Sequence, residues 1–141
     1  MLVDVGMVEA MFRYPVKSMA GEALAAADLG WHGLAADRRL ALRRTADRSG
    51  SPWLTARALP ELLRFVPVQR GAEAAAEFPT HVRSPEGEEL PAFGEELASE
   101  IGRRCGTPVQ MMRLNHGIFD AASVSLISTA TGTPSRARRS S

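Results

Sequence analysis

The chain has 141 residues, of which 45% are hydrophobic and 23% are charged, and its formal net charge is +1 at pH 7. This is the composition of one ordinary globular domain, and the near-zero charge excludes a general attraction to nucleic acid or to an acidic membrane surface. The lone cysteine, Cys105, cannot form an internal disulfide and is too few for a CxxC-type zinc site.

The opening residues, MLVDVGMVEAMF, contain two acidic residues and no basic one, so they do not resemble a secretory signal. No apolar run reaches the roughly 18 residues that a membrane-spanning helix needs. We therefore expect a cytoplasmic protein without a membrane partner.

Short strands separated by turns are predicted for the first half of the chain. A strand over residues 8–14 ends at Pro15, and a second over 22–29 is bracketed by Gly21 and Gly30. The turn-rich segment GWHGLAADRR leads into a strand over 38–43. The polar loop RTADRSGSP then precedes a short returning strand over 53–55.

The second half is predicted to contain further strands and one helix. Apolar residues over 62–68 indicate a turn and a strand, and segments 80–84 and 89–90 flank the hairpin signal PEG. The helix is expected over 94–105, because Leu97 and Ile101 lie four residues apart and Gly106 follows as a stop signal. Strands over 108–114 and 124–127 complete the pattern. The fold class is therefore mostly β (α+β): a small β-barrel of six to eight short strands with one main helix near 94–105.

Lys17 is the only lysine among seventeen basic residues, and it follows a strand that ends in Tyr-Pro. A turn at this point can direct backbone N–H groups, the Ser18 hydroxyl and the Lys17 ammonium toward one phosphate or sulfate. The alternative is a solvated turn lysine.

Two arginines occupy comparable positions at the ends of predicted strands. Arg38 follows Asp37 at a turn-to-strand junction and is either a surface charge or a guanidinium presented to an anion. Arg57, in LTAR, precedes a Pro-bounded turn and is either an exposed loop residue or a further contact.

No catalytic or metal site is predicted. The histidines, at positions 32, 81 and 116, lack metal-ligand spacing. The expected place of Cys105 at a helix C-terminus disfavours a reactive thiolate. Ser-His-Asp, P-loop, GxGxxG and HExxH patterns are absent from the sequence.

Four segments follow one another along the chain: YPVKSMAGEAL, GLAADRRLAL, LTARALPELL and FDAASVSLIST. Together they resemble the N-terminal β-barrel domain that precedes a MOSC domain (molybdenum cofactor sulfurase C-terminal domain), followed by the opening of MOSC itself. The motifs are most similar to proteins of the amidoxime-reducing-component type, which reduce N-hydroxylated compounds. The resemblance implies a β-barrel domain over 1–118 and the first strand of MOSC over 119–131. Residues 132–141 lack apolar periodicity and are predicted to be a disordered basic tail.

The resemblance implies that Lys17, Ser18 and Arg38 bind the phosphate and pterin edge of molybdopterin, the organic part of the molybdenum cofactor. Arg57 is a further contact or a structural strut. The family's usual GDR is here ADR, so Ala36 is expected in a turn that requires a positive φ.

The resemblance also implies a parent protein that is a molybdenum-dependent oxidoreductase or a sulfur carrier. The cysteine that ligates molybdenum belongs to MOSC, so we expect these 141 residues to be inactive alone and to hold the cofactor weakly or not at all. The alternative is a non-catalytic module that binds a small anion or a protein, with self-association through strand 124–127. Nucleic acid is not expected as a partner.

Overall fold

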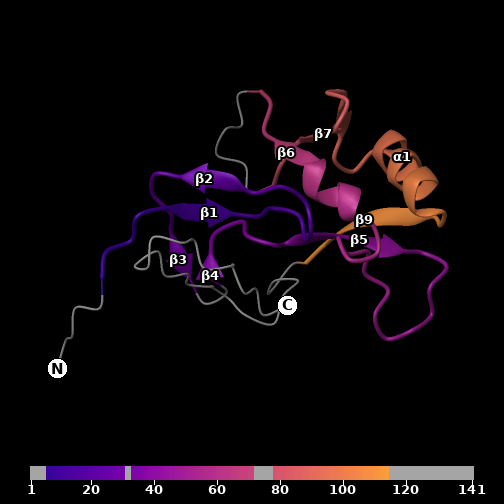
Figure 1. Ribbon diagram of the computed structural model, residues 1–141, viewed down its shortest axis with the longest axis horizontal. Helices are drawn as coiled ribbons and strands as arrows, with labels where there is room; N and C mark the ends of the chain where they lie inside the picture. The colour runs from indigo at the N-terminus through magenta and orange to yellow at the C-terminus, as the bar shows by residue number, and fades with distance from the viewer. Residues whose placement is uncertain (1–5, 31–32, 72–77, 115–141) are drawn as a thin grey trace.

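The computed structural model describes residues 6–30, 33–71 and 78–114 (Figure 1). Within these residues the elements follow in the order β1 (Met11–Arg13), β2 (Glu22–Leu24), β3 (Leu29–Gly30), β4 (Gly33–Leu34), β5 (Leu40–Arg44), the 3-10 helix η1 (Pro60–Arg64), β6 (Val66–Val68), β7 (His81–Arg83), β8 (Glu89–Pro91), α1 (Glu95–Cys105) and β9 (Val109–Arg113). The expected mostly-β fold with one main helix is confirmed.

The expected closed barrel is wrong for the described part of the chain, where the strands form four separate antiparallel sheets. These are β1–β2, β3–β4, β5–β9 and β6–β7–β8. Closure requires every strand to bond to neighbours on both sides, and among the described strands β7 alone does so. The strands are two to five residues long, too short to supply a continuous ladder.

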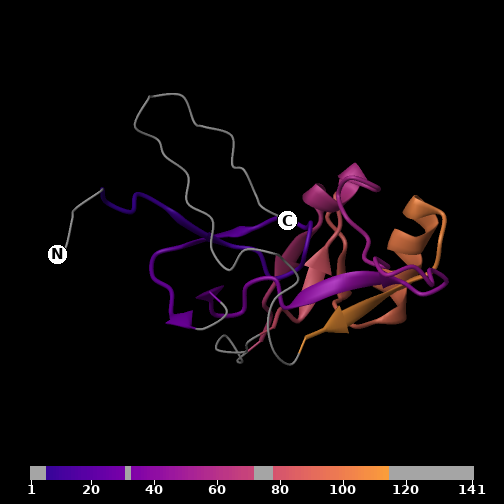
Figure 2. The ribbon, with the colours of Figure 1, turned by 90° about the horizontal axis from the view of Figure 1, so that it is seen from below.

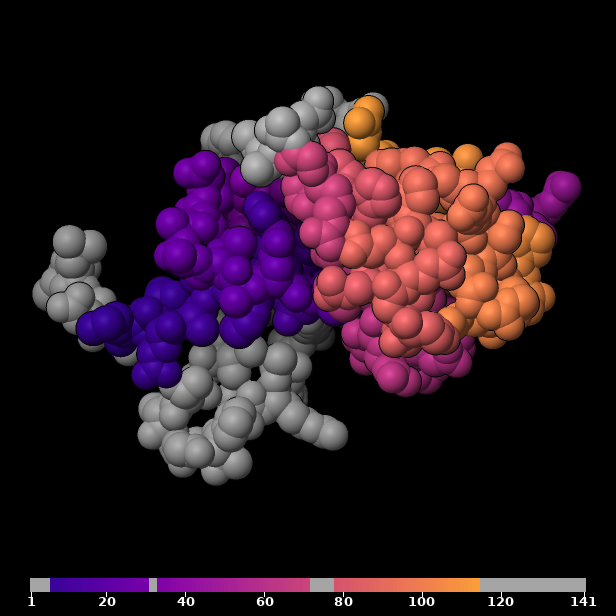
Figure 3. Space-filling view, turned by 90° about the horizontal axis from the view of Figure 1, so that it is seen from above, coloured from indigo at the N-terminus to yellow at the C-terminus, as the bar shows by residue number. Residues whose placement is uncertain are grey.

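Strands β1 to β4 lie at one end of the molecule, and helix α1 lies at the other (Figure 1). Strands β5 and β9 run side by side, as Figure 2 also shows, and their register places Leu42 opposite Met111. The space-filling view shows the N-terminal residues projecting beyond the body (Figure 3). Large apolar side chains are exposed in this part of the chain, namely Met7, Val8, Phe12 in β1 and Leu29 in β3.

Several strands differ from their predicted extent. The strand expected over 22–29 is two strands, β2 and β3, and β4 pairs with β3 although it was not foreseen. The strand expected from residue 38 begins at Leu40, because Arg38 has a left-handed φ of 47° that an extended strand cannot contain. The segment over 53–55 contributes only an isolated bridge between Trp53 and Arg43.

The helix, the hairpin and the last described strand agree with expectation. In α1 the side chains of Leu97 and Ile101 are buried, and Gly106 closes the helix with a φ of 77° and an N–H bond to the Gly102 carbonyl at 2.8 Å. The PEG turn joins β7 to β8, and β9 covers most of the strand expected over 108–114. The strand expected over 124–127 lies outside the described residues.

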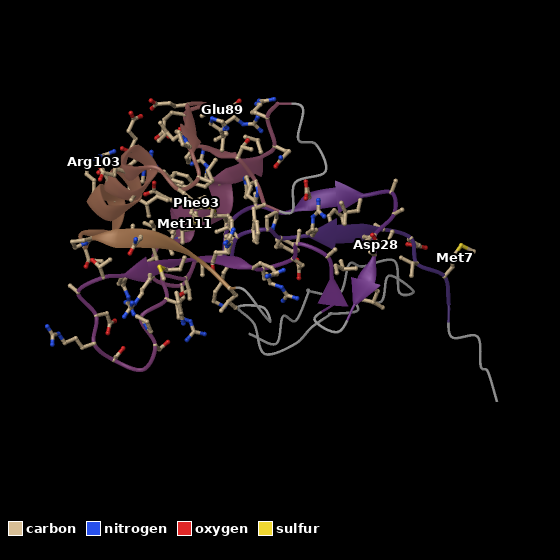
Figure 4. The ribbon with its side chains drawn as sticks, turned by 180° about the vertical axis from the view of Figure 1, so that it is seen from behind. Met7, Asp28, Glu89, Phe93, Arg103 and Met111 are labelled. Atoms are coloured by element: carbon tan, nitrogen blue, oxygen red, sulfur yellow. The ribbon has the colours of Figure 1, made fainter. Side chains whose placement is uncertain are left out.

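One apolar core joins the body to the N-terminal segment. It contains residues from the turn after β1, from β5, from η1 and its flanks, from the β7–β8 hairpin, and from α1 and β9: Val16, Met19, Leu40, Leu42, Leu54, Leu59, Leu62, Phe65, Val82, Leu90, Ala92, Leu97, Ile101, Val109 and Met111. Figure 4 shows Met111 within the body, whereas Met7 lies far out on the N-terminal projection. None of the described helices is long and apolar enough to cross a membrane.

Arg104 ties three elements together over the outer side of this core. Its guanidinium bonds to Glu100 on α1 at 2.9 Å, to Glu61 on η1 and to Glu86 in the hairpin turn, and it lies 5.1 Å from the centre of the Phe65 ring. The Arg104 side chain is only 11% exposed. A hydrogen bond from Arg104 lowers the pKa of Glu86, and hydrogen bonds from Arg103 and then Arg104 lower the pKa of Glu100.

We predict that Arg104→Met lowers the free energy of unfolding by about 1–2 kcal/mol, because it removes three ion pairs and a cation–π contact while keeping an aliphatic stem. The depressed carboxylate pKa values stabilise the fold above pH 4.5, the ordinary glutamate value, and this contribution disappears as the pH falls through the folded-state values. Stability should therefore depend less steeply on pH below 4.5 in the variant.

Urea unfolding between pH 3 and pH 7 measures both effects. Arg103→Met is the matched control, because the Arg103 side chain is 70% exposed and its recorded ion pair is with Glu100 (Figure 4). Equal decreases in the free energy of unfolding for Arg104→Met and Arg103→Met would contradict the role given to Arg104.

Candidate anion-binding site

The segment that carries Lys17 runs parallel to the start of β5. The Lys17 N–H donates to the Leu40 carbonyl at 2.8 Å, and the Leu40 N–H donates to the Pro15 carbonyl at 3.3 Å. One step earlier, the Arg38 N–H donates to the Tyr14 carbonyl at 2.6 Å. These bonds place the Lys17–Ser18 turn and Arg38 on adjacent backbone segments, which the sequence separates by about twenty residues.

Lys17 and Ser18 are the two central residues of a tight turn. The Met19 N–H bonds to the Val16 carbonyl at 3.1 Å, and Ser18 has a φ of 69°. A positive φ at the third position alone is the geometry of a type II turn, where glycine is the preferred residue. Val16 and Met19 are completely buried, so the two apolar neighbours anchor the turn and leave its polar centre half-buried.

The Ser18 hydroxyl and amide make no hydrogen bond within the described residues 6–30, 33–71 and 78–114. A serine in this conformation costs roughly 1–2 kcal/mol relative to an unstrained one. Local packing supplies no reason for a serine here instead of a glycine.

Asp37 and Arg38 form a buried ion pair, so the surface-charge interpretation of Arg38 is wrong. Their side chains are 4% and 8% exposed, and the Arg38 Nε donates to Asp37 Oδ2 at 2.7 Å. The other carboxylate oxygen, Oδ1, accepts a hydrogen bond from the Tyr14 N–H at 2.7 Å. Asp37 therefore joins the end of β1 to Arg38 through both of its oxygens.

The turn before this pair has the strain expected from the sequence. The Asp37 N–H bonds to the Leu34 carbonyl at 3.2 Å, and Ala36 has a φ of 61°. The prediction that ADR forces a positive φ on an alanine is confirmed. Among the described non-glycine residues, those with positive φ are Ser18, Ala36 and Arg38. Ser18 and Arg38 are candidate site residues, whereas Ala36 lies in the turn that leads to them.

The Tyr14 ring is held against the backbone of Gly21. A Cβ atom added to Gly21 would lie 2.5 Å from Tyr14 Cε1, which is closer than real carbon atoms approach. Gly21 is thus required for close packing. The contact fixes Tyr14, whose main chain bonds to both Asp37 and Arg38.

Arg57 is not joined to this group by any bond recorded for the described residues. It lies in an exposed turn closed by the Ala58 N–H bond to the Thr55 carbonyl, and its side chain makes no ion pair within the described parts of the chain. An exposed side chain without an ion pair does not support the strut interpretation.

Sequence reasoning did not assign Asp37 and Tyr14 to the site. An aspartate directly before a candidate arginine is a usable signal, because the two side chains can form an ion pair. Tyr14 acts through its backbone, which no side-chain pattern reveals.

The described residues hold no group of three or more metal-ligating side chains. His81 contacts Thr80 Oγ1 at 2.9 Å, and Cys105 is partly buried against the core. An open groove along α1, lined by residues such as Ala98, Gly102 and Pro108, contains none of the candidate site residues. The group around Lys17 and Arg38 is therefore the candidate site.

Comparison with known families identifies the domain that carries this site. Residues 5–98 match the family model described as the MOSC N-terminal beta barrel domain, which is 94 of the 141 residues. The chain belongs to this family. No curated protein and no solved structure matches the chain.

The part that matches the MOSC N-terminal domain contains every candidate site residue and ends at Ala98, within α1. Strand β9, which pairs with β5, lies beyond it. The division of the remaining residues at 118 and 131 stays a prediction.

Proposed function

We propose that this MOSC N-terminal domain forms the cationic part of a molybdenum-cofactor cleft and holds the phosphate end of the pterin through Lys17, Ser18 and Arg38. The parent activity that we infer is reduction of N-hydroxylated compounds or sulfur transfer. The 141 residues by themselves are expected to bind weakly and to perform no catalysis.

The observation that carries the proposal is the conformation of Ser18. Glycine would relieve the positive φ at the third position of the turn, yet the chain has a serine there, directly after its only lysine. Strain that local packing does not explain is typical of functional sites. A hydroxyl and an ammonium at the centre of one turn suit a phosphate oxygen.

The charges fit a singly or doubly charged anion better than a polyanion. Lys17 and Arg38 contribute two positive charges, and the buried Asp37 contributes one negative charge. The Asp37 carboxylate holds the Arg38 Nε, and a guanidinium has further N–H groups that can donate to an anion. A phosphate monoester, such as the one that ends molybdopterin, matches this arrangement.

When bound, the molybdenum cofactor supplies the redox or sulfur-carrying centre. The described residues would contribute only binding and orientation: Lys17 and Arg38 by charge, and Ser18 by a hydrogen bond. We assign Arg57 a place in the cleft only as a secondary contact, because its side chain is exposed and distant in the chain from the other three.

We predict that Ser18→Gly stabilises the fold by about 0.5–1 kcal/mol and weakens phosphate binding about fivefold, because strain is relieved while a hydrogen bond is lost. Ala36→Gly is the matched control: it relieves the same kind of strain and should leave binding unchanged. Urea unfolding and titration of ¹⁵N-labelled chain with inorganic phosphate measure the two effects.

In the wild-type chain the phosphate-induced shifts should centre on the amides of Lys17, Ser18 and Arg38. Shifts located elsewhere, or equal binding by the serine and glycine forms, would remove the support for the proposal.

A second experiment distinguishes the cofactor from a generic anion. We predict that the chain, co-expressed with the enzymes of cofactor biosynthesis, retains a small fraction of pterin, and that Lys17→Met abolishes this retention. Pterin is quantified as its fluorescent oxidation product. Phosphate binding without any pterin would favour the alternative, a small-anion-binding module, whereas one molybdenum per chain would contradict the expectation of weak binding.

A further inference from the structure

We propose that Asp37 is the positioning residue of the anion site: its carboxylate fixes the direction of the Arg38 guanidinium and thereby makes that cation usable. The proposal rests on the function inferred above, because it concerns the same site. It assigns a role in anion binding to a residue whose own charge should repel an anion.

Burial of the Asp37–Arg38 ion pair has a desolvation cost. The Asp37 and Arg38 side chains are 4% and 8% exposed, and removing two ions from water is unfavourable unless hydrogen bonds compensate. Both carboxylate oxygens are bonded, one to the Tyr14 N–H and one to the Arg38 Nε, each at 2.7 Å. Both Asp37 oxygens and the Arg38 Nε therefore have hydrogen-bond partners in this buried position.

The backbone of Arg38 is also held in place. Arg38 has a φ of 47°, a conformation that a lone arginine does not favour, and its N–H bonds to the Tyr14 carbonyl at 2.6 Å. The main chain of Arg38 is therefore held by Tyr14, and its side chain is held by Asp37. An arginine held at its backbone and at its Nε loses little freedom when an anion binds, which favours affinity.

Asp37 is also linked to Lys17 through the backbone. Tyr14 begins the four-residue segment that ends at Lys17, and the Lys17 N–H bonds to Leu40, two residues after Arg38. The Asp37–Tyr14 bond closes the end of this pairing where the chain leaves β1. One carboxylate therefore bonds to the Arg38 side chain and also anchors the start of the backbone segment that carries Lys17.

Because Asp37 is negatively charged, electrostatics and positioning predict opposite effects of Asp37→Asn on phosphate binding. Asp37→Asn is isosteric and can still accept the Tyr14 N–H, but its amide group opposes the Arg38 Nε–H, and the net charge of the site rises by one. A purely electrostatic account predicts tighter phosphate binding by the variant. A positioning role predicts weaker binding, by about tenfold.

The experiment is a phosphate titration of the full 141-residue chain by ¹⁵N NMR, with the Arg38 Nε–H signal followed alongside the backbone amides. Asp28→Asn is the control, because it makes the same change at an exposed aspartate directly before β3 (Figure 4). We expect it to alter binding less than about twofold. Tighter or unchanged binding by Asp37→Asn would overturn the proposal.

Two further measurements cover a variant that does not fold. Asp37→Glu keeps the charge but displaces Arg38, so positioning predicts weaker binding and electrostatics alone predicts no change. In the wild-type chain, the Arg38 Nε–H should exchange slowly with solvent, and fast exchange would refute the bond to Asp37 by itself. Absence of phosphate binding by the wild type would instead count against the proposed function, while slow exchange would still support the Asp37–Arg38 bond.

Discussion

The hydrogen bonds that Tyr14 makes with Asp37 and Arg38 are the constraint on which the arrangement of this domain depends. In the described chain, β1 and β2 pair only with each other, so neither strand pairs with a strand of another sheet. Its recorded backbone connections to the body are the bonds around Tyr14 to Lys17 and the bond from the Ala20 N–H to Phe65. The buried side chains of Val16 and Met19 supply the apolar part of the same joint. The site therefore lies where two parts of the domain meet, and the contacts that join them also position the cations.

Strain is concentrated at this joint. Ser18, Ala36 and Arg38 each adopt a left-handed conformation that glycine would adopt without cost. Nothing in the described structure explains an alanine at position 36. Ser18 gains a hydroxyl in the centre of the turn. Arg38 gains the bond to Asp37. Two of the three strained residues thus carry polar groups suited to an anion, which is the pattern expected when stability is exchanged for binding.

The sequence predicted the elements whose signals are local. Leu97, Ile101 and Gly106 define α1 by spacing and by a left-handed stop, and PEG defines the β7–β8 hairpin. The sequence also nominated Lys17, Ser18 and Arg38, which lie in turns that follow or precede strands. The structure places their backbone segments side by side, and their role in binding stays a prediction. The barrel was wrong, because closure depends on which strand edges meet, and short alternating segments do not encode those partners. Asp37 was not recognised, because its burial depends on Tyr14, 23 residues away in the chain.

The most direct test of the central claim is a crystal structure of the chain grown with tungstate, located by its anomalous scattering. Tungstate has the shape and charge of a phosphate group and identifies its own site. The account predicts one tungstate within hydrogen-bonding distance of the Lys17 ammonium, the Ser18 hydroxyl and a terminal nitrogen of Arg38, with Arg38 Nε still bonded to Asp37. An Arg38 guanidinium turned away from Asp37 into solvent, with the tungstate bound elsewhere, would contradict it.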